Sequence, residues 1–170
     1  LFRNDIRERL FMKIKTEKNF LNQEDFNNLK NQILVSPFYF TSNVSNEGAD
    51  DGYYFTHTIF DHSQILSGPI FKLIIPILNK LEAKALYKTK INLYPQTHKI
   101  LEHGQHTDTS FKCKAFILAF NTCDGYTRIG KNKIIPSIEN QGIFFEGNVP
   151  HNSTTCTDQN IRLNININYF

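Results

Sequence analysis

The sequence has no tryptophan, one methionine and only three cysteines. Cys113, Cys123 and Cys156 form an odd number, and no two of them have the CxxC spacing. This pattern argues against a disulfide framework and against a thiolate zinc site. We therefore expect a reducing, cytoplasmic setting for the chain.

Long apolar runs are missing as well. The most apolar stretch, Ile65 to Leu81, is interrupted by polar residues and prolines, and it falls short of the roughly 20 apolar residues that cross a bilayer. Residues 1–9 mix charges of both signs and lack the apolar core of a secretory signal. We expect neither a membrane span nor a leader.

No charge of one sign is concentrated in the sequence. Lysine and arginine exceed aspartate and glutamate by 19 to 16, which gives a net charge of +3 without a long basic block. Nucleic acids and anionic membranes are the partners that typically bind long basic segments. We expect neither of them as a partner.

The 170 residues, 40% of them apolar, suffice for one hydrophobic core. We expect a single domain over residues 1–170, with helices and loops as a support region over about 1–88 and a β core over about 89–170. Short runs of β-branched and aromatic residues between turn signals indicate the strands of a sandwich or barrel. These runs are Lys90 to Tyr94, Ala115 to Asn121, Lys133 to Ile138, Gly142 to Glu146 and Ile161 to Tyr169.

Two helices and a loop are predicted in the support region. Apolar residues three and four positions apart predict a helix from Phe20 to Val35, with Asn22 as its N-cap. A second helix is expected from Pro69 to about Ala85, kinked at Pro76. A short strand from Phe38 to Thr41 and a polar surface loop from Asn43 to Gly52 complete the region.

The last predicted strand has the clearest alternation. Leu163, Ile165 and Ile167 alternate with polar residues, so one face is expected to enter the core while the other is polar. Arg162 lies on the polar face.

A metal site is indicated by His106-Thr107-Asp108. Ligands two positions apart on extended backbone project to the same side. His151 is a candidate third ligand, and two histidines with one carboxylate suit open-sided Fe(II). A His-X-acid pair often arises by chance in a chain with 6 histidines and 16 acids. The prediction of a metal site therefore depends on a fourth residue, Arg162. Arg162, placed after His151, is suited to pair bidentately with a carboxylate bound beside the metal.

From Lys90 onward, about half of the chain resembles the Fe(II) and 2-oxoglutarate-dependent oxygenases, in particular their prolyl 4-hydroxylase-like branch and the small oxygenases of phages and marine bacteria. The turn at Gly125 lacks the second glycine common in the family, and tryptophan is absent, which bears on the substrate. The resemblance rests on Asn92-Leu93-Tyr94-Pro95, His106-Thr107-Asp108, Asp124-Gly125-Tyr126-Thr127, Phe144-Phe145-Glu146-Gly147, Pro150-His151 and Arg162-Leu163-Asn164-Ile165-Asn166.

The resemblance implies a mainly β fold with flanking helices around a double-stranded β-helix, a cupin-like jelly roll. It implies hydroxylation of a C–H bond in a prolyl, peptidyl or small-molecule substrate, with decarboxylation of 2-oxoglutarate to succinate and with ascorbate as reductant. No catalytic residue beyond the metal ligands is implied. The implied iron ligands are His106, Asp108 and His151, and the implied 2-oxoglutarate contacts are Arg162, Tyr94, Thr127 and Asn92.

Two other functions stay open. One is a non-catalytic binding module of the same fold. The other is a cupin-type hydrolase or isomerase that uses zinc or manganese, for which Arg162 would be incidental.

Several other residues carry weaker expectations. His98 and His103 lack a carboxylate two positions on, and His103 is expected on a solvent-facing turn. His57 and His62 have no partner that the sequence identifies. Mostly apolar pocket walls are expected, with phenylalanines 111, 116, 120, 144 and 145 as candidates, although most of these are expected in the core. Substrate selection is expected from two loops, Asn43 to Gly52 and Asp124 to Lys133.

Overall fold

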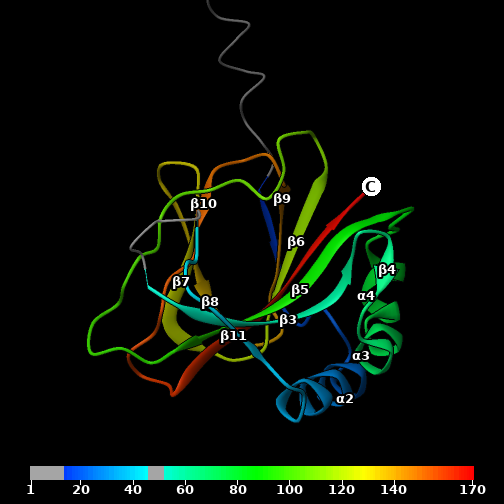
Figure 1. Cartoon of the computed structure of the whole chain (residues 1–170), viewed down its shortest axis with the longest axis horizontal. Helices are drawn as coiled ribbons and strands as arrows, with labels where there is room; N and C mark the ends of the chain where they lie inside the picture. Colours follow the sequence, from blue (N-terminus) through cyan, green and yellow to red (C-terminus); the bar gives the residue numbers. More distant parts are fainter. Residues whose placement is uncertain (1–13, 46–51) are drawn as a thin grey trace, which may run out of the picture.

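A computed structural model describes residues 14–45 and 52–170 of the chain. The expectations for residues 1–9, and for most of the loop from Asn43 to Gly52, lie outside these residues. The described residues form eleven strands and three helices, labelled as in Figure 1. In chain order the elements are β1 Lys15–Glu17, α2 Gln23–Leu34, β2 Tyr39–Thr41, β3 Tyr54–Asp61, β4 Gln64–Ile65, α3 Gly68–Leu73, α4 Ile75–Lys80, β5 Leu86–Pro95, β6 Lys114–Ala119, β7 Cys123–Ile129, β8 Lys133–Ser137, β9 Gly142–Glu146, β10 His151–Asn152 and β11 Ile161–Tyr169.

The strands form a larger and a smaller antiparallel sheet (Figure 1). The larger sheet has the order β1-β9-β6-β11-β5-β3-β2, with β4 added beside β3, and the smaller has the order β10-β7-β8. At the middle of the larger sheet β11 pairs with β5, so that Arg162 lies opposite Tyr94 and Asn164 opposite Asn92. The predicted mainly β, jelly-roll architecture with flanking helices is confirmed.

Helix α2 covers one face of the larger sheet, and its N-terminus is the predicted one. The side chain of Asn22 accepts a hydrogen bond from the backbone N–H of Asp25 at 2.9 Å, which caps the first turn. The buried face consists of Phe26, Leu29 and Ile33, and Phe26 stacks on Phe120 at a ring distance of 5.8 Å. This packing anchors the helix to the sheet.

The second predicted helix is instead two short ones, α3 and α4. The chain turns at Ile74, and Pro76 lies in the first turn of α4. Proline has no N–H to donate and its ring clashes with the carbonyl one turn earlier, so the break replaces the expected kink. No helix in the described part of the chain is long and apolar enough to span a membrane.

The N-terminal part contains more sheet than the expected helices and loops. Strand β3 pairs with β5, and β1 pairs with β9 at the far edge. The expected loop from Asp124 to Lys133 is also largely strand, because it contains most of β7, which pairs with β8. Asp124 and Gly125 favour turns, so the local sequence did not indicate a strand here. Pairing of β7 with β8 outweighs that turn preference.

Strand β11 has the predicted bounds, but its polar face is not exposed. Leu163, Ile165 and Ile167 lie in the main hydrophobic core, as expected. The alternate residues Arg162, Asn164, Asn166 and Asn168 are 2–6% exposed. They face the space between the two sheets, and that space contains the candidate site.

Candidate functional site

The structure brings His106, Asp108 and His151 together. One possible ligand atom from each residue lies within 4.8 Å of the others. His106 precedes the larger sheet's β6, His151 opens β10, and the two are joined as an isolated antiparallel bridge. The order and spacing of the motif therefore correspond to a real cluster in space.

Both histidines are oriented by hydrogen bonds from the ring nitrogen Nδ1. Nδ1 of His151 lies 2.9 Å from the carbonyl of Val149, and Nδ1 of His106 lies 3.3 Å from the carbonyl of Gly104. A carbonyl only accepts, so each Nδ1 carries a proton and each Nε2 is the atom left for a metal. Such outer contacts fix the tautomer that a metal-ligating histidine needs.

The carboxylate of Asp108 is fixed by two amides from β11. Asn166 and Asn168 donate to its Oδ2 at 3.0 and 2.9 Å, while Oδ1 lies 3.6 Å from Nε2 of His151. Burial alone would raise the pKa of Asp108, but the contact with His151 and the two amides outweigh it and hold the pKa well below its usual value. Asp108 is therefore an ionised carboxylate with one oxygen directed at His151.

Arg162 is a buried cation next to Thr127 and Tyr94, on the same face of β11 as the two asparagines. Its side chain donates to the carbonyl of Thr154 at 3.1 Å and to Oγ1 of Thr127 at 2.8 Å. It is 2% exposed, and burial lowers its pKa. Among residues 14–45 and 52–170, no carboxylate lies within 4.0 Å of the guanidinium, and Nε has no hydrogen-bond partner.

The other predicted 2-oxoglutarate contacts surround Arg162. The guanidinium carbon lies 5.5 Å from the ring centre of Tyr94, and Thr127 accepts the hydrogen bond described above. Asn92 is one pleat away, where it donates to Asn164 at 3.0 Å. Their binding role stays a prediction, but their grouping is part of the structure.

Gly125 makes room for Arg162. A Cβ at this position would lie 2.7 Å from Cδ of Arg162 and 2.6 Å from the carbonyl oxygen of Thr155. The glycine of the motif is therefore required by close packing of the arginine.

A narrow cavity connects the surroundings of Arg162 with the histidines. Its volume is about 20 Å³, enough for about one water molecule, so a dicarboxylate enters only if lining side chains move. The expectation of apolar walls is wrong for this cavity, since most of its lining residues are polar. The lining consists of Val44, Tyr54, Lys90, Asn92, Tyr94, His106, Ile117, Thr127, His151, Asn152, Ser153, Asn164 and Asn166.

Of the five candidate wall phenylalanines, only Phe145 lies against a predicted ligand. Its ring centre is 5.0 Å from that of His151. Phe116, Phe120 and Phe144 belong to the main core, while Phe111 is exposed.

A wider pocket of about 400 Å³ adjoins the cavity on the side of Asp108. Lys90, Tyr54, Val44 and His106 line both spaces and so form the partition between them. This pocket is the open approach to the candidate metal position.

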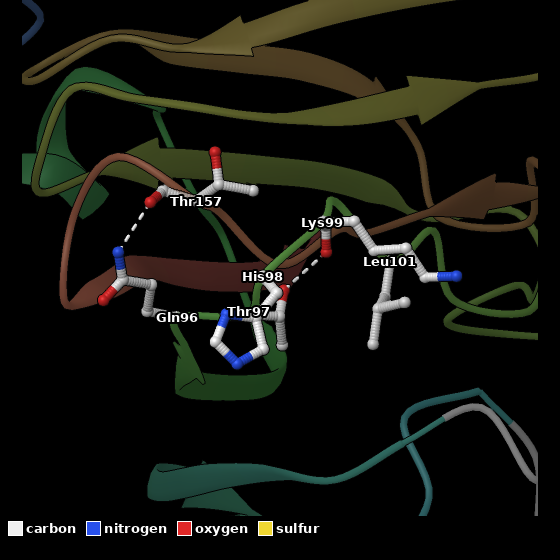
Figure 2. Close-up of a pocket in the computed structure, with 6 residues that line it drawn as sticks. All are labelled: Gln96, Thr97, His98, Lys99, Leu101 and Thr157. Atoms are coloured by element: carbon white, nitrogen blue, oxygen red, sulfur yellow. Dashed lines mark hydrogen bonds between the residues drawn. The ribbon is translucent and has the colours of Figure 1, made fainter.

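The remaining histidines lie elsewhere. His103 is buried rather than on a solvent-facing turn, because Nδ1 bonds to Ser153 at 2.9 Å and the ring stacks on Tyr94 at 5.3 Å. Nδ1 of His57 lies 2.7 Å from the carbonyl of Pro37, and His62 is exposed. His98 borders a surface hollow of about 690 Å³, formed by Gln96, Thr97, Lys99, Leu101 and Thr157, which contains none of the candidate ligands (Figure 2).

Sequence reasoning did not identify Asn166, Asn168 or Lys90 as site residues. The signal for the two asparagines was present, since they share the alternation of β11 with Arg162. Lys90 shares the alternation of β5 with Asn92 and Tyr94 in the same way.

Comparisons with known proteins rest on structure, because no protein-family profile and no curated protein matches the sequence. A 2OG-Fe(II) oxygenase family oxidoreductase from Burkholderia pseudomallei matches with a TM-score of 0.71 and 11% identity, over 92% of this chain and 84% of that one. The chain has the fold of the 2OG-Fe(II) oxygenases. A second structure with this fold is a prolyl hydroxylase from Trichoplax adhaerens in complex with a peptide of hypoxia inducible factor, with a TM-score of 0.66 and 16% identity over 92% and 83% of the two chains.

A third similar structure is named as an epimerase and not as a hydroxylase. The alpha-ketoglutarate-dependent epimerase SnoN from nogalamycin biosynthesis matches with a TM-score of 0.68 and 12% identity, over 92% of this chain and 77% of that one. The resemblance predicted from the sequence, including the prolyl hydroxylase branch, is thus confirmed at the level of the fold.

Proposed function

We propose that the protein is an Fe(II)- and 2-oxoglutarate-dependent oxygenase that hydroxylates a C–H bond of a peptidyl, prolyl or small-molecule substrate. The observation that carries the proposal is Arg162, a buried cation without a carboxylate partner in the described residues. It lies against Thr127 and Tyr94, which line one cavity together with His106 and His151. A buried charge is costly unless it is paired. An anionic ligand in this cavity would supply the missing partner.

The residues fit both implied groups. Nε2 of each histidine and Oδ1 of Asp108 form the set of two imidazoles and one carboxylate that suits Fe(II) with open positions. The bound metal would supply the redox chemistry of oxygen. Two of the four electrons that reduce O2 would come from decarboxylation of 2-oxoglutarate to succinate and two from the substrate C–H bond, with one oxygen atom entering each product. Iron and 2-oxoglutarate binding by these residues are part of the proposal.

The protein side chains place the co-substrate and exclude water. Arg162 would donate two parallel hydrogen bonds to the far carboxylate of 2-oxoglutarate, with Thr127 and Tyr94 beside it. Asn92, one pleat nearer to the histidines, would contact the middle of the molecule. Burial strengthens these contacts, because competing water is removed.

The test is an anaerobic titration with Fe(II) and 2-oxoglutarate, followed through the visible charge-transfer band of the chelated complex. We expect a band in the wild type, no band in His106→Ala, and a higher half-saturating 2-oxoglutarate concentration in Arg162→Ala. His98→Ala removes an exposed histidine outside the site and is the matched control. A folded wild type without a band would refute the proposal.

The two alternatives give other outcomes in the same assay. A binding module would show no conversion of 2-oxoglutarate to succinate, with or without ascorbate as reductant. A cupin-type enzyme would act with zinc or manganese and would not need Arg162.

The cytoplasmic setting stays part of the proposal, and three free, buried cysteines support it.

A further inference from the structure

Lys90 is a second cation at the site, and it has no acidic partner among the described residues. It lies on the inner face of β5, and its Nζ is 3.3 Å from the hydroxyl of Tyr54 and 5.5 Å from the centre of that ring. Its neighbour on the same face, Lys88, is paired with Asp61 at 2.9 Å. The two lysines therefore differ in one respect, because only the charge of Lys88 is compensated by a described residue.

Lys90 and Arg162 occupy opposite ends of one pair of stacked tyrosines. The rings of Tyr54 and Tyr94 are 5.5 Å apart and 11° from parallel. Arg162 lies against Tyr94 and Lys90 against Tyr54, each at 5.5 Å from the ring centre. The site thus has two separate cations, Arg162 behind Tyr94 and Lys90 at the partition between the two spaces.

The wider pocket presents Lys90 to whatever approaches the candidate metal position. Asp108, which is assigned to the metal, is the only carboxylate among its described lining residues. The volume of about 400 Å³ is in the range of small-ligand sites. The rest of the lining consists largely of hydroxyls, amides and the two lysines, namely Thr41, Ser42, Asn43, Ser45, Tyr54, Thr107, Asn168, Lys88 and Lys90, with Val44 and His106.

We propose that Lys90 binds an anionic oxygen group of the primary substrate, so that the substrate is a small molecule with a carboxylate or a phosphate. This inference rests on the proposed function. An uncharged prolyl side chain over Lys90 would remove water from the ammonium group without replacing it by a partner. An anionic substrate supplies that partner and places its C–H bond beside His106 and Asp108.

The experiment measures substrate-stimulated formation of succinate from 2-oxoglutarate. One probe is a cell extract of molecules below about 1 kDa, a size suited to a small-ligand pocket, separated by anion exchange. The other is a set of synthetic prolyl peptides. We expect stimulation from the retained, anionic fractions. Stimulation confined to the unretained fraction, to the prolyl peptides, or to none of the probes would overturn the proposal.

Lys90→Gln and Lys88→Gln then locate the recognition. For the active anionic fraction, we expect Lys90→Gln to raise the half-saturating amount at least about tenfold, as loss of one charged hydrogen bond does, and Lys88→Gln to change it by less than about threefold. Equal effects would overturn the role of Lys90.

The charge-transfer titration separates this role from two others. In Lys90→Gln the half-saturating 2-oxoglutarate concentration should stay within about twofold of the wild-type value, since Arg162 is intact. A tenfold rise would assign Lys90 to 2-oxoglutarate and overturn the proposal. Absence of the band from the wild type would instead refute the oxygenase function itself.

Discussion

His106 and His151 exchange two backbone hydrogen bonds, at 3.0 Å from the N–H of His106 and 2.8 Å from that of His151. A pair of this kind fixes the relative position of two Cα atoms. The two candidate imidazole ligands are therefore held by main chain before any metal binds, and the ring contacts through Nδ1 add the orientation. These backbone and Nδ1 contacts therefore preorganise the two imidazoles for a metal.

Asn166→Ala and Asn168→Ala should each weaken Fe(II) binding. Each removes one of the two amides that hold Oδ2 of Asp108. Losses of such outer contacts typically reduce metal affinity about 10- to 100-fold. Anaerobic Fe(II) titration at fixed pH measures the change.

Asn164→Ala is the matched control for this pair. It lies on the same face of β11, but its side chain accepts from Asn92 and does not contact Asp108. Its Fe(II) affinity should stay within about threefold of the wild-type value, well below the typical effect of an outer contact. An equal loss in all three variants would mean that the amides act through the strand and not through Asp108.

Arg162→Met should have opposite effects on stability and on co-substrate binding. Removing a buried charge relieves its desolvation, so the free energy of unfolding without 2-oxoglutarate should not fall, and a gain of about 1 kcal/mol is reasonable. Saturating 2-oxoglutarate should stabilise the wild type and leave the variant unchanged. Urea unfolding with and without 2-oxoglutarate gives both numbers. A strongly destabilised variant would show that Arg162 is mainly structural.

Gly125→Ala should impair 2-oxoglutarate binding without a change at the metal ligands. The new methyl group would meet Cδ of Arg162 and the carbonyl of Thr155, so the arginine must shift. We expect at least about a tenfold rise in the half-saturating 2-oxoglutarate concentration, since misplacement of a charged hydrogen bond costs on the order of 1.5–3 kcal/mol. Gly68→Ala, where the added Cβ meets nothing within 4 Å, should behave as the wild type.

Cys156 should resist alkylation in the native protein. Burial, together with the neighbouring thiol of Cys123, raises the pKa of Cys156 to about 12. At pH 8 only about one molecule in ten thousand would carry the reactive thiolate. Mass spectrometry after iodoacetamide treatment should find Cys156 unmodified until urea unfolds the chain. Rapid labelling of the folded protein at pH 8 would contradict this.

The sequence predicted the parts of the fold that follow from local pattern. The helix capped by Asn22 and the strand from Ile161 to Tyr169 both lie where their periodicity placed them. Strands β3 and β7 were not predicted, because Thr56, His57 and Thr58 in β3, and Gly125 in β7, weaken the apolar alternation. Those strands are stabilised by partners that are distant in sequence.

The candidate site was predicted in its ligands but not in its surroundings. The short motif at His106 and the order of His151 and Arg162 could be read along the chain. The burial of the polar face of β11 could not, since alternation indicates that two faces differ and not that one of them is exposed. Lys90 was not considered for the same reason, since it lies on the inner face of β5. His103 was misplaced because its burial comes from Tyr94 and Ser153, whose proximity the local sequence does not indicate.

Strand β11 has a consequence for how this protein can change over evolution. Its odd-numbered residues build the hydrophobic core, and its even-numbered ones present Arg162, Asn164, Asn166 and Asn168 to the site. Insertion or deletion of one residue would exchange the two sets. Hydrophobic packing and chemistry would then fail together, so this strand can vary by substitution but not in length.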